Sequence, residues 1–143
     1  MRSIIIVLFC LMGYLTSAQQ YTLSWEDNSK VKVTADFQLQ SPTISMLVNP
    51  TPELSDGQAH FIENLKAYDQ SGQQISVKYK GVGDWKLKAN AGDDVKITYE
   101  IILKHEDYFW PFGIEEVAYT QDNGMFFTGL SLFIVPSLEI KTP

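Results

Sequence analysis

Apolar and polar residues alternate along most of the chain after residue 20. Between residues 95 and 101 an apolar side chain stands at every second position, and lysine, threonine and glutamate lie between them. The same alternation recurs in the stretches 21–25, 31–37, 44–48, 75–79 and 85–89. Period two is typical of strands that bury one face, and no stretch has the spacing of a helix of three turns. The sequence therefore predicts an all-β protein, an antiparallel β-sandwich of about eight or nine strands with lysines on its outer faces.

Turn-forming residues separate these predicted strands. Asp27-Asn28-Ser29 joins the first two into a hairpin, and Asn49-Pro50-Thr51-Pro52 ends the third. Asp56 and the pair Asp93-Asp94 are interpreted as turn formers rather than catalytic carboxylates, because Asp beside Gly hydrogen-bonds its own backbone. The stretch 61–68 fits either a short helical turn or a strand, and both interpretations stay open.

The first 18 residues differ from the rest of the chain. Arg2 precedes an apolar run over residues 4–15, and the small residues Thr16-Ser17-Ala18 follow. This order is typical of a secretory signal peptide, and the run is shorter than the roughly 18 apolar residues of a membrane-spanning helix. We expect cleavage after Ala18, a folded domain over residues 19–143, a periplasmic or secreted location in a bacterium, and no integral membrane segment.

Charge and residue types exclude several functions for the part after residue 18. It has ten lysines against 17 acidic residues, a net charge of −7, and neither arginine nor cysteine. Phosphate contacts need clustered Lys and Arg, so no nucleic-acid partner is expected. His105-Glu106 lacks the second histidine of a zinc motif, because Phe109 stands there, and His60 is far away in the chain. We expect no catalytic residue, no metal and no cofactor within this chain.

Aromatic residues concentrate between residues 108 and 133. The stretch from Met125 to Val135 is predicted to be one strand that is apolar on both faces, so both faces need cover. Either it is a central strand covered within the domain, or its second face belongs to a partner or to a missing part of the protein. Trp85 is expected in the core. The candidate partner or ligand surface comprises Phe109, Trp110, Phe112, Phe126, Leu130 and Leu132.

Two further stretches have a recognisable residue order. Phe61-Ile62-Glu63-Asn64-Leu65-Lys66-Ala67-Tyr68-Asp69 precedes Gly72, the triplet Trp85-Lys86-Leu87 and a strand over 95–99. Later, Tyr119-Thr120 is followed by an Asn-Gly pair and a Leu-Phe strand over 122–133. This order resembles the N-terminal β-domain of the glycyl aminopeptidase family of zinc metallopeptidases, which often carry a C-terminal PDZ domain.

The resemblance implies a non-catalytic accessory domain, a fragment of a secreted or periplasmic aminopeptidase-like metalloprotease. Such a domain packs on a catalytic domain, of the same polypeptide or of another protein, and helps to shape a peptide site. The zinc ligands and the catalytic glutamate lie in a helical domain that follows, so zinc is expected only there. Residues 138–142 begin another alternating strand, so the sandwich is expected to be incomplete at its C-terminus. The alternative is a free-standing periplasmic binding module that holds a glycan, peptide or lipid with Trp110 and its aromatic neighbours.

Overall fold

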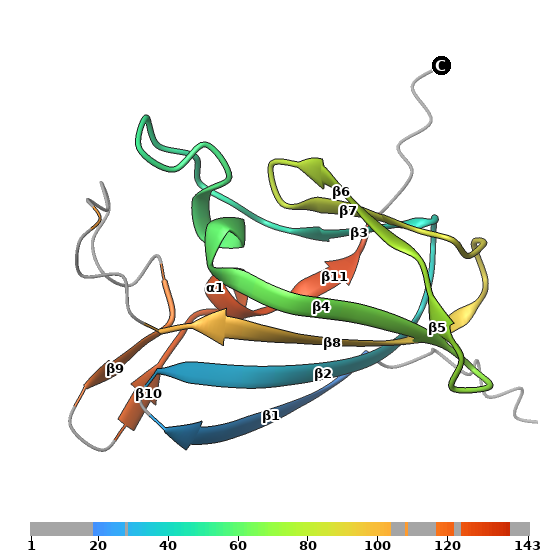
Figure 1. The fold of residues 1–143 in the computed structure, drawn as a ribbon, viewed down its shortest axis with the longest axis horizontal. Helices are drawn as coiled ribbons and strands as arrows, with labels where there is room; N and C mark the ends of the chain where they lie inside the picture. Colours follow the sequence, from blue (N-terminus) through green and yellow to red (C-terminus); the bar gives the residue numbers. More distant parts are fainter. Residues whose placement is uncertain (1–18, 28, 104–107, 109–116, 122–123, 138–143) are drawn as a thin grey trace, which may run out of the picture.

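The computed structural model describes residues 19–27, 29–103, 108, 117–121 and 124–137. These residues form eleven strands in three antiparallel sheets (Figure 1). The larger two sheets pack face to face as a sandwich, which confirms the predicted all-β class. Several of the strands have only two to four residues, so the count exceeds the predicted eight or nine.

The first sheet has five strands in the order β1-β2-β8-β4-β5. Their bounds are Gln20–Asp27, Lys30–Gln38, Asp94–Ile102, Ile62–Asp69 and Gln74–Ile75. The strands β1 and β2 form the predicted hairpin, and β2 pairs along its whole length with β8. Alternation places the apolar rows of β2 and β8 on one shared inner face.

The second sheet has four strands in the order β11-β3-β7-β6. Their bounds are Ile134–Pro136, Thr43–Met46, Asp84–Leu87 and Val77–Gly81. A third sheet pairs β9 (Tyr119–Gln121) with β10 (Gly124–Phe126), and it lies beyond the end of the five-stranded sheet (Figure 1).

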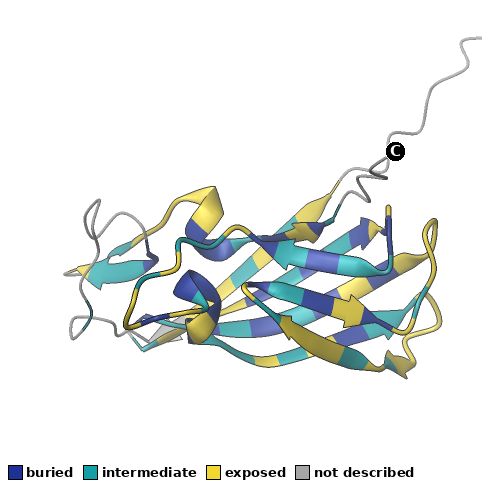
Figure 2. Cartoon of the chain, turned by 90° about the horizontal axis from the view of Figure 1, so that it is seen from above, coloured by how far each residue is buried: buried dark blue, intermediate teal, exposed yellow. Residues whose placement is uncertain are grey.

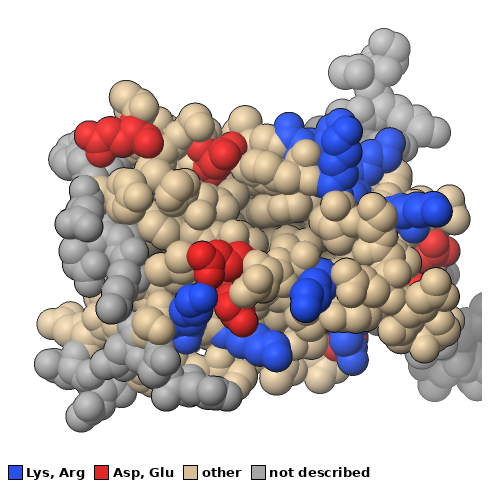
Figure 3. Space-filling view, in the orientation of Figure 1, with Lys and Arg blue, Asp and Glu red and all other residues tan. Residues whose placement is uncertain are grey.

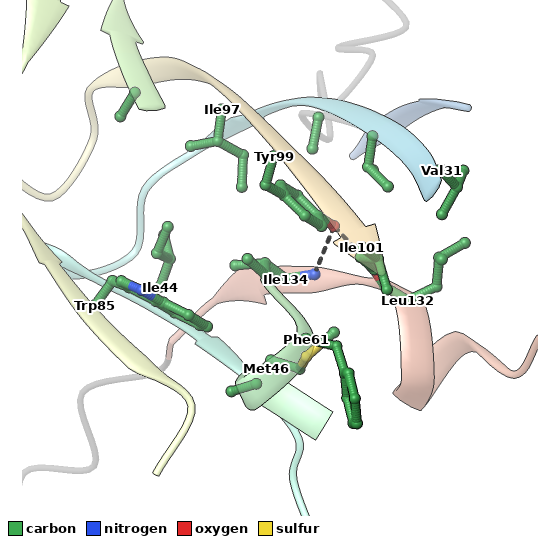
Figure 4. Packing of buried hydrophobic residues seen from close by; sticks show 14 of the residues in the cluster. Val31, Ile44, Met46, Phe61, Trp85, Ile97, Tyr99, Ile101, Leu132 and Ile134 are labelled. Atoms are coloured by element: carbon green, nitrogen blue, oxygen red, sulfur yellow. Dashed lines mark hydrogen bonds between the residues drawn. The ribbon is translucent and has the colours of Figure 1, made fainter. Parts of the chain in front are cut away.

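The core lies between the two larger sheets (Figures 2 and 4). Its inner rows come from β2 and β8 on one side and from β3, β7 and β11 on the other. Trp85 is only 5% exposed, which confirms its predicted place in the core. The central members are Val31, Val33, Ile97, Tyr99, Ile44, Met46, Trp85, Leu132 and Ile134.

Two single-turn helices interrupt the strands among the described residues. A 3-10 helix, η1, spans Gly57–Phe61 and runs directly into β4, so the ambiguous stretch 61–68 is a strand that begins at the end of a helical turn. The second helix, α1, spans Gly129–Leu132. Within the described ranges no helix is long and apolar enough to cross a membrane.

The stretch from Met125 to Val135 is not the single strand that the sequence predicts. Strand β10 ends at Phe126, α1 follows, and β11 starts at Ile134. The prediction was wrong because it rested on the apolar pattern alone. That pattern takes no account of Thr128, whose side chain caps the start of a helical turn. In one strand Leu130 and Leu132 would share a face, whereas in this helical turn Leu132 is buried and Leu130 is exposed.

Candidate functional site

The C-terminal segment is attached to the core by the side chain of Tyr99 on β8. Its hydroxyl donates a hydrogen bond to the Leu132 carbonyl oxygen at 2.8 Å and accepts one from the Ile134 amide at 3.1 Å (Figure 4). Burial raises the pKa of this hydroxyl well above its ordinary value. The hydroxyl therefore stays protonated and joins the five-stranded sheet to the backbone on either side of Phe133.

A second tyrosine supports the same segment from the edge strand β1. The Tyr21 hydroxyl donates to the Ile134 carbonyl oxygen at 2.9 Å, and its ring lies 4.3 Å from the ring of Phe133. Two residues of the first sheet thus hold the backbone that leads from α1 into β11.

The direction of each side chain in α1 is set by a capping box. The Thr128 hydroxyl accepts from the Ser131 amide at 3.3 Å, and the Ser131 hydroxyl accepts from the Thr128 amide at 3.0 Å. These bonds satisfy donors that a helix start leaves unpaired. The turn that they begin points Leu132 into the core, where it is 0% exposed, and leaves Leu130 59% exposed.

Three apolar side chains within the five consecutive residues 126–130, which run from the end of β10 into α1, are exposed. We call Phe126, Phe127 and Leu130 the apolar patch; their exposed fractions are 50%, 42% and 59%. Phe126 stacks on Tyr119 of the neighbouring strand with ring centroids 5.3 Å apart, and Phe127 meets Phe133 edge to face at 6.1 Å.

These aromatic contacts hold the apolar patch in place without covering it. Full burial of a large apolar side chain is worth about 1.5–3 kcal/mol, so covering the three would contribute a substantial binding free energy. Exposed apolar patches mark protein interaction sites, and these three side chains lie within five residues of one another in the chain. The arrangement can therefore serve as a docking surface.

The candidate surface residues differ in how far the structure buries them. Phe126 and Leu130 are exposed, as a surface role requires, whereas Leu132 is fully buried and belongs to the core. The prediction that Leu132 lies at the surface was wrong, because within the turn of α1 the side chains of Leu130 and Leu132 point in different directions.

Phe109, Trp110 and Phe112 lie outside the described residues, and the binding-module alternative depends on them. Phe127, which the candidate set omitted, joins the patch because it directly follows β10.

Of the two histidines, only His60 lies in the described part of the chain. His60 is exposed, and its ring lies 5.3 Å from that of Phe61 and 5.8 Å from that of Tyr108. His105 falls outside the described residues. Among the residues that the structure describes, no three His, Cys, Asp or Glu side chains come together in a group that could hold a metal ion.

A groove of about 550 Å³ lies at the end of the five-stranded sheet where β1 and β8 begin and β2 and β4 end. It is open and shares no residue with the apolar patch. Its walls mix acidic, amide and aromatic side chains, without a described histidine. The residues that line it are Gln20, Asp36, Phe37, Tyr68, Asp69, Gln70, Gly72, Asp94, Val95 and Lys96.

Sequence reasoning missed the two polar groups that shape this end of the molecule. Alternation places Tyr99 inward, but it does not say that the hydroxyl would meet backbone atoms of residues 132 and 134. The Thr128-x-x-Ser131 spacing is a capping signal that sequence reading had available, although serine is a weaker partner than the usual glutamate or glutamine.

Two packed antiparallel sheets define an all-β sandwich domain. The family model described as Peptidase M61 N-terminal domain matches residues 20–143, and the chain belongs to this family. The match confirms the resemblance to the N-terminal domain of a metallopeptidase. It also means that the chain corresponds to an accessory domain of a peptidase rather than to the catalytic one.

A solved structure has a similar fold. The crystal structure of the aminopeptidase N family protein from Idiomarina loihiensis superposes with a TM-score of 0.59 at 22% sequence identity. The similarity covers 82% of this chain and 19% of that one, so the chain spans about a fifth of the length of that protein. No curated protein matches the chain.

Proposed function

We propose that this chain is the non-catalytic N-terminal domain of a secreted or periplasmic aminopeptidase-like metalloprotease. In this proposal the domain packs on a catalytic domain and helps to shape a peptide site. Membership in the Peptidase M61 N-terminal domain family supports the accessory role. The structural match supports a larger parent, because the similar region is only 19% of that solved protein.

The observation that carries the docking proposal is the apolar patch. Phe126, Phe127 and Leu130 are exposed, and the tyrosines of the first sheet hold the backbone that follows them at residues 132 and 134. A surface on a well-anchored backbone loses little conformational entropy on binding, which favours affinity. The catalytic domain is the proposed occupant of this surface.

Zinc chemistry is assigned to the catalytic domain alone. A catalytic zinc site uses three protein ligands and one open position, and the described part of this chain brings no such set together. In this proposal the domain positions and covers the peptide site, and the reaction belongs to the catalytic domain.

The first test reads the coding DNA beyond codon 143. An in-frame His-Glu-x-x-His sequence in a helical domain supports the proposal, because this spacing binds zinc on one face of a helix. A stop codon at that point contradicts it and favours the free-standing binding module.

The second test changes the apolar patch in the purified domain. The double variant Phe126→Ser/Leu130→Ser removes apolar surface from exposed positions, so we expect its melting temperature to stay within a few degrees. Self-association, measured by sedimentation, should fall, as should binding to the separately produced catalytic domain. The control Leu47→Ser removes an equally exposed leucine, 62% exposed on another part of the surface, and should change neither property.

Export is a separate part of the proposal. Arg2, the apolar run over residues 4–15 and the small residues up to Ala18 support a signal peptide that is removed. The mature chain then begins at Gln19 and contains no thiol. Intact-mass measurement of the exported protein tests this, and retention of residues 1–18 contradicts it.

A further inference from the structure

Four of the chain's ten lysines lie close together on the β6–β7 hairpin. Lys78 and Lys80 belong to β6, Lys86 belongs to β7, and Lys88 directly follows β7. All four are exposed. Lys78 and Lys86 are direct partners in the strand register, on the face opposite to Trp85 and Leu87. Lysine side chains gather over these strands, at the upper edge in Figure 3.

Two lysines of the five-stranded sheet, Lys30 and Lys96, have carboxylate partners, whereas Lys32 and Lys66 form no described ion pair and lie on separate strands. Lys30 lies 2.7 Å from Glu63 and 3.5 Å from Glu100, and Lys96 lies 3.6 Å from Asp36. Among the described residues no ion pair involves a lysine of the β6–β7 hairpin. The acidic residue on that outer face, Asp84, instead accepts a hydrogen bond from the Ser45 hydroxyl at 2.6 Å.

Neither folding nor protection of the sheet edge explains this arrangement. Like charges directly opposite each other on neighbouring strands are destabilising, so the pair Lys78 and Lys86 costs stability. Lysines on an edge strand do discourage aggregation, and β6 is an edge strand. Strand β7, however, lies between β3 and β6, so edge protection does not account for Lys86.

The chemistry of this face favours an acidic polypeptide. The hairpin has no arginine for bidentate phosphate contact. Tyr79 lies on the Trp85 side of the sheet, with ring centroids 5.2 Å apart, so the lysine-bearing face has no aromatic ring on which a base could stack. The neighbouring strand β3 presents Thr43 and Ser45, whereas surfaces that insert into lipid carry Trp, Phe or Leu. Successive outward side chains of a strand are roughly 6.5 Å apart, which matches carboxylates at every second residue of an extended segment.

We propose that the outer face of the β6–β7 hairpin binds an extended, carboxylate-rich segment of a protein partner, with Lys78 and Lys86 at the centre of the contact. Charge complementarity carries this assignment, because these ammonium groups have no described carboxylate of their own. The face shares no residue with the apolar patch, so this inference and the proposed docking on a catalytic domain stand or fall separately.

The test uses the purified protein and a fluorescein-labelled peptide in which glutamate alternates with threonine. Fluorescence anisotropy should report saturable binding that weakens between low salt and about 0.15 M salt, because exposed charges are screened. The variant Lys78→Gln/Lys86→Gln should bind about tenfold more weakly, as expected for the loss of two exposed ion pairs. A peptide with glutamine in place of glutamate should not bind.

The matched control is Lys32→Gln/Lys66→Gln, which removes two exposed lysines from the five-stranded sheet. It should change the affinity less than about twofold. The melting temperature of the Lys78→Gln/Lys86→Gln variant should stay equal or rise, since a like-charge pair is removed.

Three results overturn the inference. One is equal loss of affinity in the two double variants, which would reflect net charge alone. Another is absence of binding to the glutamate peptide. The third is lysine-dependent binding to phosphatidylglycerol vesicles without binding to the peptide, which would assign the face to an anionic membrane.

Discussion

Tyr99 is a core residue whose side chain also makes two buried hydrogen bonds to the backbone. Its ring fills the space between the sheets and is 1% exposed, while its hydroxyl satisfies one carbonyl and one amide of the C-terminal segment. Buried backbone groups that lose their partner cost free energy, because water is not available to replace it. The packing of the ring and the bonding of the hydroxyl are therefore separable contributions to stability.

Tyr99→Phe keeps the ring and removes both hydrogen bonds. We expect the free energy of unfolding to fall by about 1–3 kcal/mol, the cost of leaving buried polar groups unpaired. Urea unfolding followed by tryptophan fluorescence measures it. The control is Tyr68→Phe, since the Tyr68 hydroxyl has no hydrogen bond among the described residues; equal losses in the two variants would contradict the role of the Tyr99 hydroxyl.

The Tyr99 hydroxyl should also make the stability of the domain depend on pH in the alkaline range. The pKa of Tyr99 is raised in the folded state by burial, whereas in the unfolded chain it is about 10. Because the folded state holds the proton more tightly, this contribution is complete below pH about 10 and is lost as pH rises further. Melting temperatures measured above pH 10 should fall less steeply for Tyr99→Phe than for the parent; identical slopes would contradict this.

Two leucines of α1 differ in their surroundings although they are two positions apart. Leu132→Ala empties a fully buried site and should cost about 2–5 kcal/mol. Leu130→Ala trims an exposed side chain and should change stability by no more than about 0.5 kcal/mol. Urea unfolding compares the two variants directly. Similar losses would restore the single-strand prediction for residues 125–135, in which both leucines share a face.

At the scale of elements, the turn between β6 and β7 is closely constrained. Val82 has a φ of +51°, which a β-branched residue rarely adopts, and the Asp56 carboxylate accepts a hydrogen bond from its amide at 2.9 Å. That bond, together with one from the Tyr79 hydroxyl, lowers the pKa of Asp56. The loop before η1 therefore holds this turn, although Asp56 was interpreted from the sequence as a local turn former.

The glycines on either side of Val82 allow a matched comparison. Both have positive φ, but a Cβ at Gly83 would lie 2.6 Å from the Met46 carbonyl oxygen, whereas at Gly81 nothing lies within 4 Å. Gly83→Ala should therefore cost about 1–3 kcal/mol more than Gly81→Ala, because only the former forces the backbones of β3 and the turn apart. Thermal unfolding of both variants measures the difference, and equal losses would contradict the close approach.

At the scale of the whole molecule, the topology joins residues that are far apart in the sequence. Strand β2 pairs with β8, and β3 pairs with β11, so Met46 lies opposite Ile134. Each of these pairings closes a long loop before it gains contact energy. The sandwich therefore depends on the last described strand to complete its second sheet.

Folding of the domain should accordingly be slow for its size. Proteins dominated by such non-local strand pairing fold on the order of milliseconds to seconds. Stopped-flow refolding from urea tests this, with the fluorescence of the buried Trp85 as the signal. A relaxation on the microsecond scale would show that local contacts govern folding instead.

The all-β class, the first hairpin, the inward rows of β2, β7 and β8, and kinship with a metallopeptidase N-terminal domain could all be predicted from the amino-acid order alone. Alternation suffices for the fold class and the inward rows, because a one-residue slip would turn every apolar side chain of a strand toward water. Burial of Val31, Val33, Trp85, Ile97 and Tyr99 follows directly from that periodicity. The kinship came instead from the residue order over 61–99 and 119–133.

The conformation of the C-terminal segment and the position of the candidate surfaces depend on contacts between distant parts of the chain. Over residues 125–135 apolar residues occupy both possible faces, so periodicity does not select a direction for Leu130 or Leu132. That choice is made by the hydrogen bonds of Thr128 with Ser131 and of Tyr99 with residues 132 and 134. The register that sets Lys78 opposite Lys86 is likewise a pairing between two strands, because no local pattern states which residues of neighbouring strands will meet.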